Sequence, residues 1–119
     1  MKIFGHEYDF ALTVGASAKI AEMCPDGDLS RIGEVLSGNN FSETAKNGAE
    51  IVVAMASAAD AVKRFEGAPA EHPALTVEML FALSQADFMA AMTEAMSAFG
   101  RDSKPTIEVE PSKKKENGE

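Results

Sequence analysis

The sequence predicts a mainly α-helical fold in which four to five helices pack around one long central helix, with a small N-terminal β-hairpin and a disordered C-terminal tail. Three observations lead to this prediction. Apolar residues recur at helical spacing over most of residues 14–99. The longest such pattern, at residues 42–67, has an apolar surface that is half alanine, which indicates a helix with close neighbours on two sides. Residues 101–119 hold too few apolar side chains to offset the entropy of ordering, so we expect a domain at 1–100 and a tail at 101–119.

The β-hairpin is expected before the helical pattern begins. Apolar residues alternate in two short segments, residues 2–4 and residues 8–13. Gly5-His6-Glu7 separates these segments and supplies the turn. Because an isolated hairpin is only marginally stable in water, this one is expected to lie on the rest of the protein.

Two shorter helices are expected next. From Val14 the apolar spacing becomes helical, and the proline and glycine within residues 24–28 then impose a turn. Asp28 is predicted to cap a short helix that continues through Leu36. The polar residues 37–40 end it.

The long central helix is predicted to start with Ser42 as its N-cap and to end at Gly67. Large apolar residues fall on one stripe at alternating spacings of four and three, and we expect them to be buried. If so, Phe65→Ala should cost roughly 3–5 kcal/mol. The residues of the stripe include Ile51, Met55, Val62 and Phe65.

Two further helices follow a loop rich in proline and alanine. Thr76 is predicted to cap a short helix through Leu83. Ser84, with an acid three residues later, resembles a capping box and starts the last helix, which Gly100 is placed to end as the C′ residue. The apolar stripe of this last helix is Phe88, Met92, Ala95 and Phe99.

The charge and hydropathy of the chain exclude several classes of function. The formal net charge is −8 and the sequence pI is about 4.7, whereas a general nucleic-acid binder needs clustered lysine and arginine. No apolar run is long enough to span a bilayer, and polar residues come too early for a signal peptide. We therefore expect a soluble cytoplasmic protein that binds neither nucleic acid nor membranes.

Residue types that commonly carry catalysis are scarce, with two histidines, one cysteine and one tyrosine. We therefore expect no enzyme, no catalytic residues and no cofactor. His6 and His72 lie in loops far apart in sequence and lack ligand spacing, so we expect them to be solvated and expect no metal site. Cys24 precedes Pro25 at the end of a helix, without a basic neighbour, and is expected to be a buried structural thiol.

Methionines on the last helix suggest a face that binds a partner. Such faces accept varied partners because the unbranched thioether repacks easily. The alternative is that a methionine and phenylalanine stripe at helical spacing belongs to the core of a bundle. The two interpretations are compatible if the last helix is shared between core and partner. The candidate partner-binding residues are Met89, Met92, Met96 and Phe99.

Several short motifs, taken in order, resemble a known protein family. They are Phe4-Gly5-His6-Glu7-Tyr8, then Leu12-Thr13-Val14-Gly15-Ala16, then Ile20-Ala21-Glu22-Met23-Cys24-Pro25-Asp26-Gly27-Asp28-Leu29, then Leu75-Thr76-Val77-Glu78-Met79-Leu80 and Leu83-Ser84-Gln85-Ala86-Asp87-Phe88. This order resembles the tail assembly chaperones of long-tailed phages and prophages of Gram-positive-type bacteria. In that family an aromatic-Gly hairpin precedes a helix that ends in a Cys-Pro-x-Gly-Asp-type turn. Val77 departs from the family, whose members often have proline there.

The resemblance implies a non-catalytic protein that holds the long helical tape measure protein, keeps it soluble and brings tail tube subunits to it. Such a protein acts in the host cytoplasm and is absent from the mature virion. A small cytosolic regulatory or adaptor protein of a phage or bacterium is the alternative, and self-association stays open. A tail tube gene just upstream and a very long gene for a helical protein just downstream would favour the chaperone.

Overall fold

The structure, a computed structural model, describes residues 1–104. The predicted tail lies outside the described residues from 105 onward. Within residues 1–104 the chain forms five α-helices and a two-stranded hairpin, which confirms the predicted fold class. The elements are β1 (Lys2–Ile3), β2 (His6–Glu7), α1 (Val14–Ala21), the 3₁₀ turns η1 (Pro25–Gly27) and η2 (Leu29–Arg31), α2 (Ile32–Val35), α3 (Phe41–Phe65), α4 (Val77–Phe81) and α5 (Gln85–Asp102).

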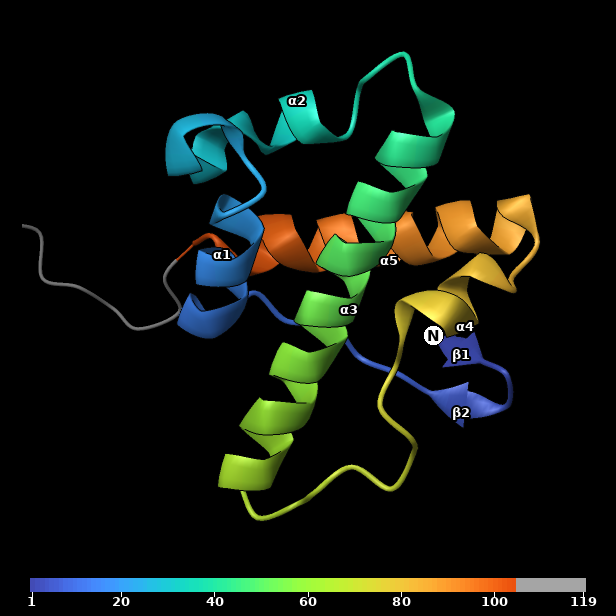
Figure 1. Cartoon of the computed structure of the whole chain (residues 1–119). Helices are drawn as coiled ribbons and strands as arrows, with labels where there is room; N and C mark the ends of the chain where they lie inside the picture. Colours follow the sequence, from blue (N-terminus) through green and yellow to red (C-terminus); the bar gives the residue numbers. More distant parts are fainter. Residues whose placement is uncertain (105–119) are drawn as a thin grey trace, which may run out of the picture.

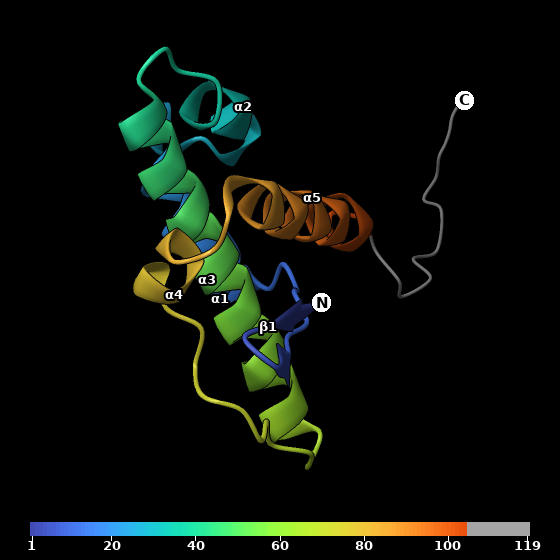
Figure 2. The same cartoon turned by 90° about the vertical axis from the view of Figure 1, so that its right-hand side faces the viewer.

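The long helix α3 is the centre of the fold, and α1, α2, α4 and α5 all contact it. Figure 1 shows α5 crossing behind α3, with α1 on one side of α3 and α4 and the hairpin on the other. In Figure 2 the start of α5, all of α4 and the upper part of α3 lie near one another on the side that faces the reader. The prediction of helices packed around one long helix is therefore confirmed.

The ends of α3 follow from local chemistry. The side chain of Asn40 accepts a hydrogen bond from the backbone N–H of Glu43, so Asn40 is the N-cap and the predicted start at Ser42 is wrong by two residues. Lys63 and Arg64 in the last turn suit the negative end of the helix dipole. Gly67 has a φ of 86°, the left-handed conformation that commonly follows a helix, so the predicted end is confirmed.

Only part of the apolar stripe on α3 is buried. Ile51 and Met55 are fully buried as predicted, but Val62 is 38% exposed and Phe65 is 87% exposed. The buried residues of α3 lie between Gly48 and Ala59, where the other helices contact it. Beyond that region α3 projects past α1 and α5, as Figure 1 shows, so its last apolar residues have no helix to pack against.

Helices α3 and α5 approach closely at Gly48. A Cβ atom at Gly48 would lie 2.9 Å from Sδ of Met92, so the glycine makes room for that side chain. Small residues on α5 allow the same close packing, since Ala91, Ala95 and Ala98 are all buried. On α3 itself Ala49, Ala56, Ala58 and Ala59 are buried, so the prediction that this alanine-rich helix has close neighbours is confirmed.

Helix α5 does not end at Gly100 as predicted but continues to Asp102. The reason is tertiary, because the last turn holds the segment that precedes α1. Asp102 Oδ2 accepts a hydrogen bond from the backbone N–H of Leu12 at 3.0 Å, and Arg101 Nη2 donates one to the carbonyl of Phe10 at 3.0 Å. Arg101 and Asp102 therefore pack with the domain, so the predicted boundary between domain and tail at residue 100 is wrong by at least two residues.

The hairpin is confirmed, but its second strand is formed by His6-Glu7, which the sequence predicts as part of the turn. Lys2 pairs with Glu7 and Ile3 pairs with His6, and the two-residue turn is Phe4-Gly5, where both φ angles are positive. Residues 8–13 do not form the predicted second strand but cross α3 from the hairpin to α1 without regular secondary structure (Figure 1), and Ala11 donates a backbone hydrogen bond to the carbonyl of Met55 at 3.1 Å. The hairpin thus lies on the protein as expected.

The predicted caps of the shorter helices are confirmed. Asp28 accepts a hydrogen bond from the backbone N–H of Ser30 at the start of η2. Thr76 caps α4, and Ser84 accepts a hydrogen bond from the backbone N–H of Asp87 and so caps α5. The caps of α4 and α5 place the two helices at an angle around a short connection.

Candidate partner-binding surface

The structure divides the predicted methionine face of α5 between core and surface. Met92 and Phe99 pack against the core, Met96 is half-buried and Met89 is 52% exposed. At about 100° per residue, Met92 and Phe99 lie at the edge of the buried arc and Met89 lies farthest from it. The four residues therefore do not form one free surface, and only Met89 presents a large apolar area to solvent.

A second apolar surface lies where α3 begins, α4 ends and α5 begins. It is a groove of about 470 Å³, and we refer to it as the phenylalanine groove. Leu80 and Phe88 are buried and form its floor, while Phe41 and Phe81 form its rim and are 66% and 54% exposed. The lining residues are Phe41, Ser42, Ala45, Leu80, Phe81, Leu83, Gln85 and Phe88.

Each wall of this groove lies at the start or the end of a helix. Asn40 caps α3 and thereby places Phe41 at the first helical position, facing outward. Ser84 caps α5 and turns the chain so that Phe88 lies against Leu80 and Phe81 of α4. Met89 follows Gln85 by four residues and so lies on the same face of α5, although it does not line the groove.

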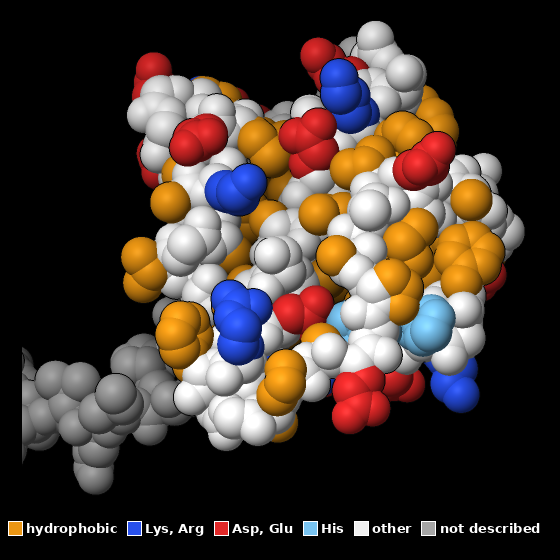
Figure 3. All heavy atoms as spheres, turned by 60° about the horizontal axis from the view of Figure 1, so that its bottom comes forward, with side chains coloured by type: hydrophobic (Ala, Val, Ile, Leu, Met, Phe, Trp, Pro, Cys, Tyr) orange, Lys and Arg blue, Asp and Glu red, His pale blue; other side chains and the backbone are white. Residues whose placement is uncertain are grey.

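The charges near the groove have one sign on two of its three helices. Residues 67–100 contain Glu71, Glu78, Asp87 and Glu94 but no lysine or arginine. Glu78 on α4 and Asp87 on α5 are exposed, but neither lines the groove. The third wall, α3, carries exposed Glu43 and Lys46, and Lys46 lies one turn after Ser42. Figure 3 shows hydrophobic side chains gathered on the part of the molecule where α4 lies, with both acidic and basic side chains at the border.

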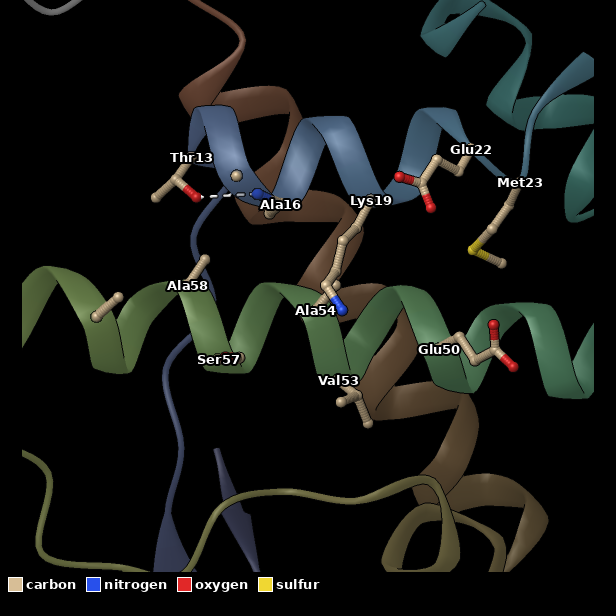
Figure 4. A pocket seen from close by; sticks show the side chains of 12 residues that line it. Thr13, Ala16, Lys19, Glu22, Met23, Glu50, Val53, Ala54, Ser57 and Ala58 are labelled. Atoms are coloured by element: carbon tan, nitrogen blue, oxygen red, sulfur yellow. Dashed lines mark hydrogen bonds between the residues drawn. The ribbon is translucent and has the colours of Figure 1, made fainter. Parts of the chain in front are cut away.

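A further hollow of about 500 Å³ lies between α1 and α3. Its walls are mostly small, with Gly15 and Ala16 on α1 facing Ala54 and Ala58 on α3. Figure 4 shows Lys19 extending from α1 across the hollow toward Ala54. Packing of small residues between neighbouring helices accounts for this hollow, and its lining does not indicate a particular ligand.

His72 is not the solvated loop histidine that we expected. Its side chain is almost entirely buried, its ring packs against Tyr8 with centroids 4.2 Å apart, and Nε2 lies 3.3 Å from a carboxylate oxygen of Asp60 on α3. The carbonyl of Pro73 accepts hydrogen bonds from Tyr8 Oη at 2.7 Å and from His72 Nδ1 at 3.0 Å. These contacts fasten the loop between α3 and α4 to the N-terminal segment. His6, in contrast, is exposed as predicted.

Titratable groups near this cluster are shifted by their surroundings. Burial raises the pKa of Tyr8, and the Asp60 carboxylate raises it further. Lys63 lies 2.7 Å from Asp9, and its hydrogen bond lowers the pKa of the Asp9 carboxyl. Both shifts accompany structural contacts that hold residues 8 and 9 against α3.

Cys24 is buried as predicted, and its Sγ donates a weak hydrogen bond to the carbonyl of Ile20 at 3.4 Å. Burial raises the pKa of the thiol, which keeps it in the unreactive protonated form at neutral pH. Among residues 1–104, no three His, Cys, Asp or Glu side chains gather as they would around a metal ion. None of the helices in the described part of the chain is long and apolar enough to cross a membrane.

Sequence analysis missed the phenylalanine groove. A predicted N-cap at Ser42 leaves Phe41 outside the long helix, and the apolar stripes of the sequence analysis do not include Phe81. The available signal was a phenylalanine beside the expected cap of the long helix, at a position that does not join the core stripe. No family model, curated protein or solved structure matches the chain. The motifs and the groove geometry therefore remain the basis for assigning a function.

Proposed function

We propose that this protein is a non-catalytic phage tail assembly chaperone, which binds the tape measure protein and helps to recruit tail tube subunits. In this role it acts in the host cytoplasm and is absent from the mature virion. The order of the sequence motifs supports the family. The observation that carries the proposal is the phenylalanine groove, an apolar surface whose rim residues Phe41 and Phe81 are more than half exposed.

An exposed apolar groove is what a protein needs to hold a chain that would otherwise aggregate. A contiguous apolar patch on a protein surface commonly marks a site for a partner. Burying the exposed half of one phenylalanine ring, roughly 100 Å², is worth about 2.5 kcal/mol. Each ring can therefore contribute as much as a binding hot spot, for which the threshold is about 2 kcal/mol.

The alternative, a small regulatory or adaptor protein, uses the same kind of surface. The groove itself does not separate the two functions, because both bind a protein partner. The chaperone requires one specific partner, which is long and helical and is insoluble or degraded when made alone. The genes beside this one distinguish the two proposals before any protein is made.

Co-expression tests the proposed function directly. The tape measure protein encoded in the same phage or prophage is produced alone and together with this protein, and its soluble fraction is measured by centrifugation and immunoblotting. We expect the tape measure protein to precipitate or be degraded when alone and to be soluble with its chaperone. Equal solubility in the two cultures would contradict the proposal, as would precipitation in both.

A further inference from the structure

We propose that His72 is a proton-dependent clasp. Its doubly protonated ring holds the loop between α3 and α4 against the N-terminal segment, and loss of one proton releases that loop. The inference is independent of the proposed function, since it concerns a conformational device within the fold and not a partner. It gives a role to a buried histidine that we expected to be solvated.

Both ring nitrogens of His72 face oxygen atoms that accept hydrogen bonds and have none to donate. Nδ1 lies 3.0 Å from the carbonyl oxygen of Pro73, and Nε2 lies 3.3 Å from a carboxylate oxygen of Asp60 on α3. A neutral imidazole carries one N–H group and one nitrogen lone pair. In either neutral tautomer that lone pair faces an oxygen lone pair, so only the imidazolium offers a proton to both oxygens.

Burial makes this mismatch costly. The side chain of His72 is 8% exposed and that of Asp60 is 20% exposed. Nε2 is shielded from water and has no hydrogen-bond partner among residues 1–104, although Asp60 lies at ion-pair distance. A buried polar atom without a partner destabilises a fold. A charged ring relieves the mismatch, because attraction to the carboxylate does not require the alignment of a hydrogen bond.

The groups that pack around His72 favour a positive ring. The ring of Tyr8, with its centroid 4.2 Å from that of the imidazole, is an aromatic surface of the kind that attracts cations. Asp9 and Asp60 are two carboxylates, whereas Lys63 is one ammonium group and is ion-paired with Asp9 at 2.7 Å. An imidazolium balances the remaining negative charge. The other charged side chains nearby are exposed: Glu7, which pairs with the N-terminal ammonium group, Glu71, and Arg64, which packs over the Phe65 ring.

The clasp holds the middle of a largely exposed loop. Figure 1 shows this loop running from the end of α3 back to α4. Tyr8 Oη donates a hydrogen bond to the same Pro73 carbonyl at 2.7 Å, and the chain next becomes buried at Leu75, just before α4. The hold on residues 68–74 therefore weakens when the ring loses a proton. The loop should open more often as the pH rises through the range in which histidine titrates, about pH 5–8.

Two measurements on the full-length protein test the clasp. Nitrogen NMR shifts of a histidine ring show whether one or both of its nitrogens carry protons, and exposed His6 is the internal reference. At the pH at which half of the His6 rings are charged, most His72 rings should carry both protons. Amide hydrogen exchange in residues 68–74, corrected for its intrinsic dependence on pH, should become at least about threefold faster from about pH 5.5 to about pH 7.5.

Asp60→Asn separates the effect of the proton from the shape of the site. An asparagine amide donates to Nε2 when the ring is neutral and accepts from it when the ring is charged, so the loop should stay protected at every pH. His72→Gln should also remove the dependence on pH, with faster exchange throughout. His6→Gln is the matched control, since it makes the same change on the exposed histidine, and it should keep the parent's response. The N-terminal ammonium group titrates near about pH 8 in every variant, so comparison between variants removes its contribution.

Several results would overturn the inference. Loop exchange that does not depend on pH in the parent would do so, as would a His72 ring that titrates together with His6. If Asp60→Asn keeps the parent's response, another group is responsible for it. A neutral His72 ring in a parent whose response Asp60→Asn removes would place the proton on Asp60 and refute the clasp. Should His72→Gln fail to fold, the Asp60→Asn comparison and the NMR shifts still decide the question.

Discussion

Met55→Ala should reduce the stability of the fold more than Phe65→Ala does, although side-chain size alone suggests the reverse order. Phenylalanine is the larger residue, yet Phe65 is 87% exposed whereas Met55 is completely buried. Truncating Met55 removes core contacts and leaves a cavity, which typically costs about 2–5 kcal/mol. Truncating Phe65 removes little beyond the contact of its ring with Arg64, 5.6 Å away, and an exposed cation–π contact is worth at most about 1 kcal/mol.

Thermal unfolding followed by circular dichroism measures both changes against the parent. At about 4 °C or more per kcal/mol for a domain of this size, Met55→Ala should lower the thermal midpoint by at least about 8 °C. Phe65→Ala, which costs at most about 1 kcal/mol, should lower it by no more than about half as much. A larger loss for Phe65→Ala than for Met55→Ala would refute the reasoning, because it would mean that the end of α3 is covered.

Three further predictions concern the hydrogen bonds, the helix packing and the acid response. Tyr8→Phe removes the hydroxyl that bonds to the loop after α3, and should lower the free energy of unfolding by about 1 kcal/mol in urea titrations. Gly48→Val should lower the free energy of unfolding by about 1–3 kcal/mol, because its Cβ would displace Met92. Gly100→Ala, whose Cβ would meet nothing within 4 Å, should raise it by about 0.5–1 kcal/mol. A destabilised Gly100→Ala would show that this glycine ends the helix after all. The hydrogen bond from the Arg101 guanidinium, and then the one from the backbone N–H of Leu12, hold the pKa of Asp102 below its ordinary value. This carboxylate therefore stabilises the fold above about pH 4, and its contribution is lost as the pH falls through the lowered pKa. Asp102→Asn should therefore lose less stability than the parent between about pH 4 and pH 2, and equal slopes would contradict the assignment.

Local signals in the sequence were sufficient for most of the helices. Thr76 and Ser84 were predicted as caps because a side-chain oxygen at that position bonds to a backbone N–H only three residues away. The left-handed Gly67 after α3 followed from equally short-range chemistry. Such features depend on neighbours in sequence, so a single sequence reveals them.

Features that depend on where helices cross could not be predicted in this way. Phe65 lies on the same stripe as Met55, and only the point at which α1 and α5 leave α3 decides that one is buried and the other exposed. Gly100 has the residue type of a helix end, but Arg101 and Asp102 find partners in the segment before α1 and extend the helix. In both cases tertiary contacts outweigh the local pattern.

The structure divides the candidate residues predicted on α5 between the core and the surface. Methionines at helical spacing drew attention to α5, and Met89 is indeed exposed, but Met92 fills the space beside Gly48. The groove combines Phe41 with Phe81, forty residues later in the chain. Their proximity depends on the angle at which α4 meets α3, which hydrophobic periodicity does not encode.

The central claim is that this protein keeps the tape measure protein soluble by holding it at the phenylalanine groove. The most direct measurement is the soluble fraction of the tape measure protein co-expressed with the double variant Phe41→Glu/Phe81→Glu, compared with the parent and with Phe65→Glu. We predict that the parent and Phe65→Glu keep the partner soluble and that the folded double variant does not. Full solubilisation by the double variant would contradict the account.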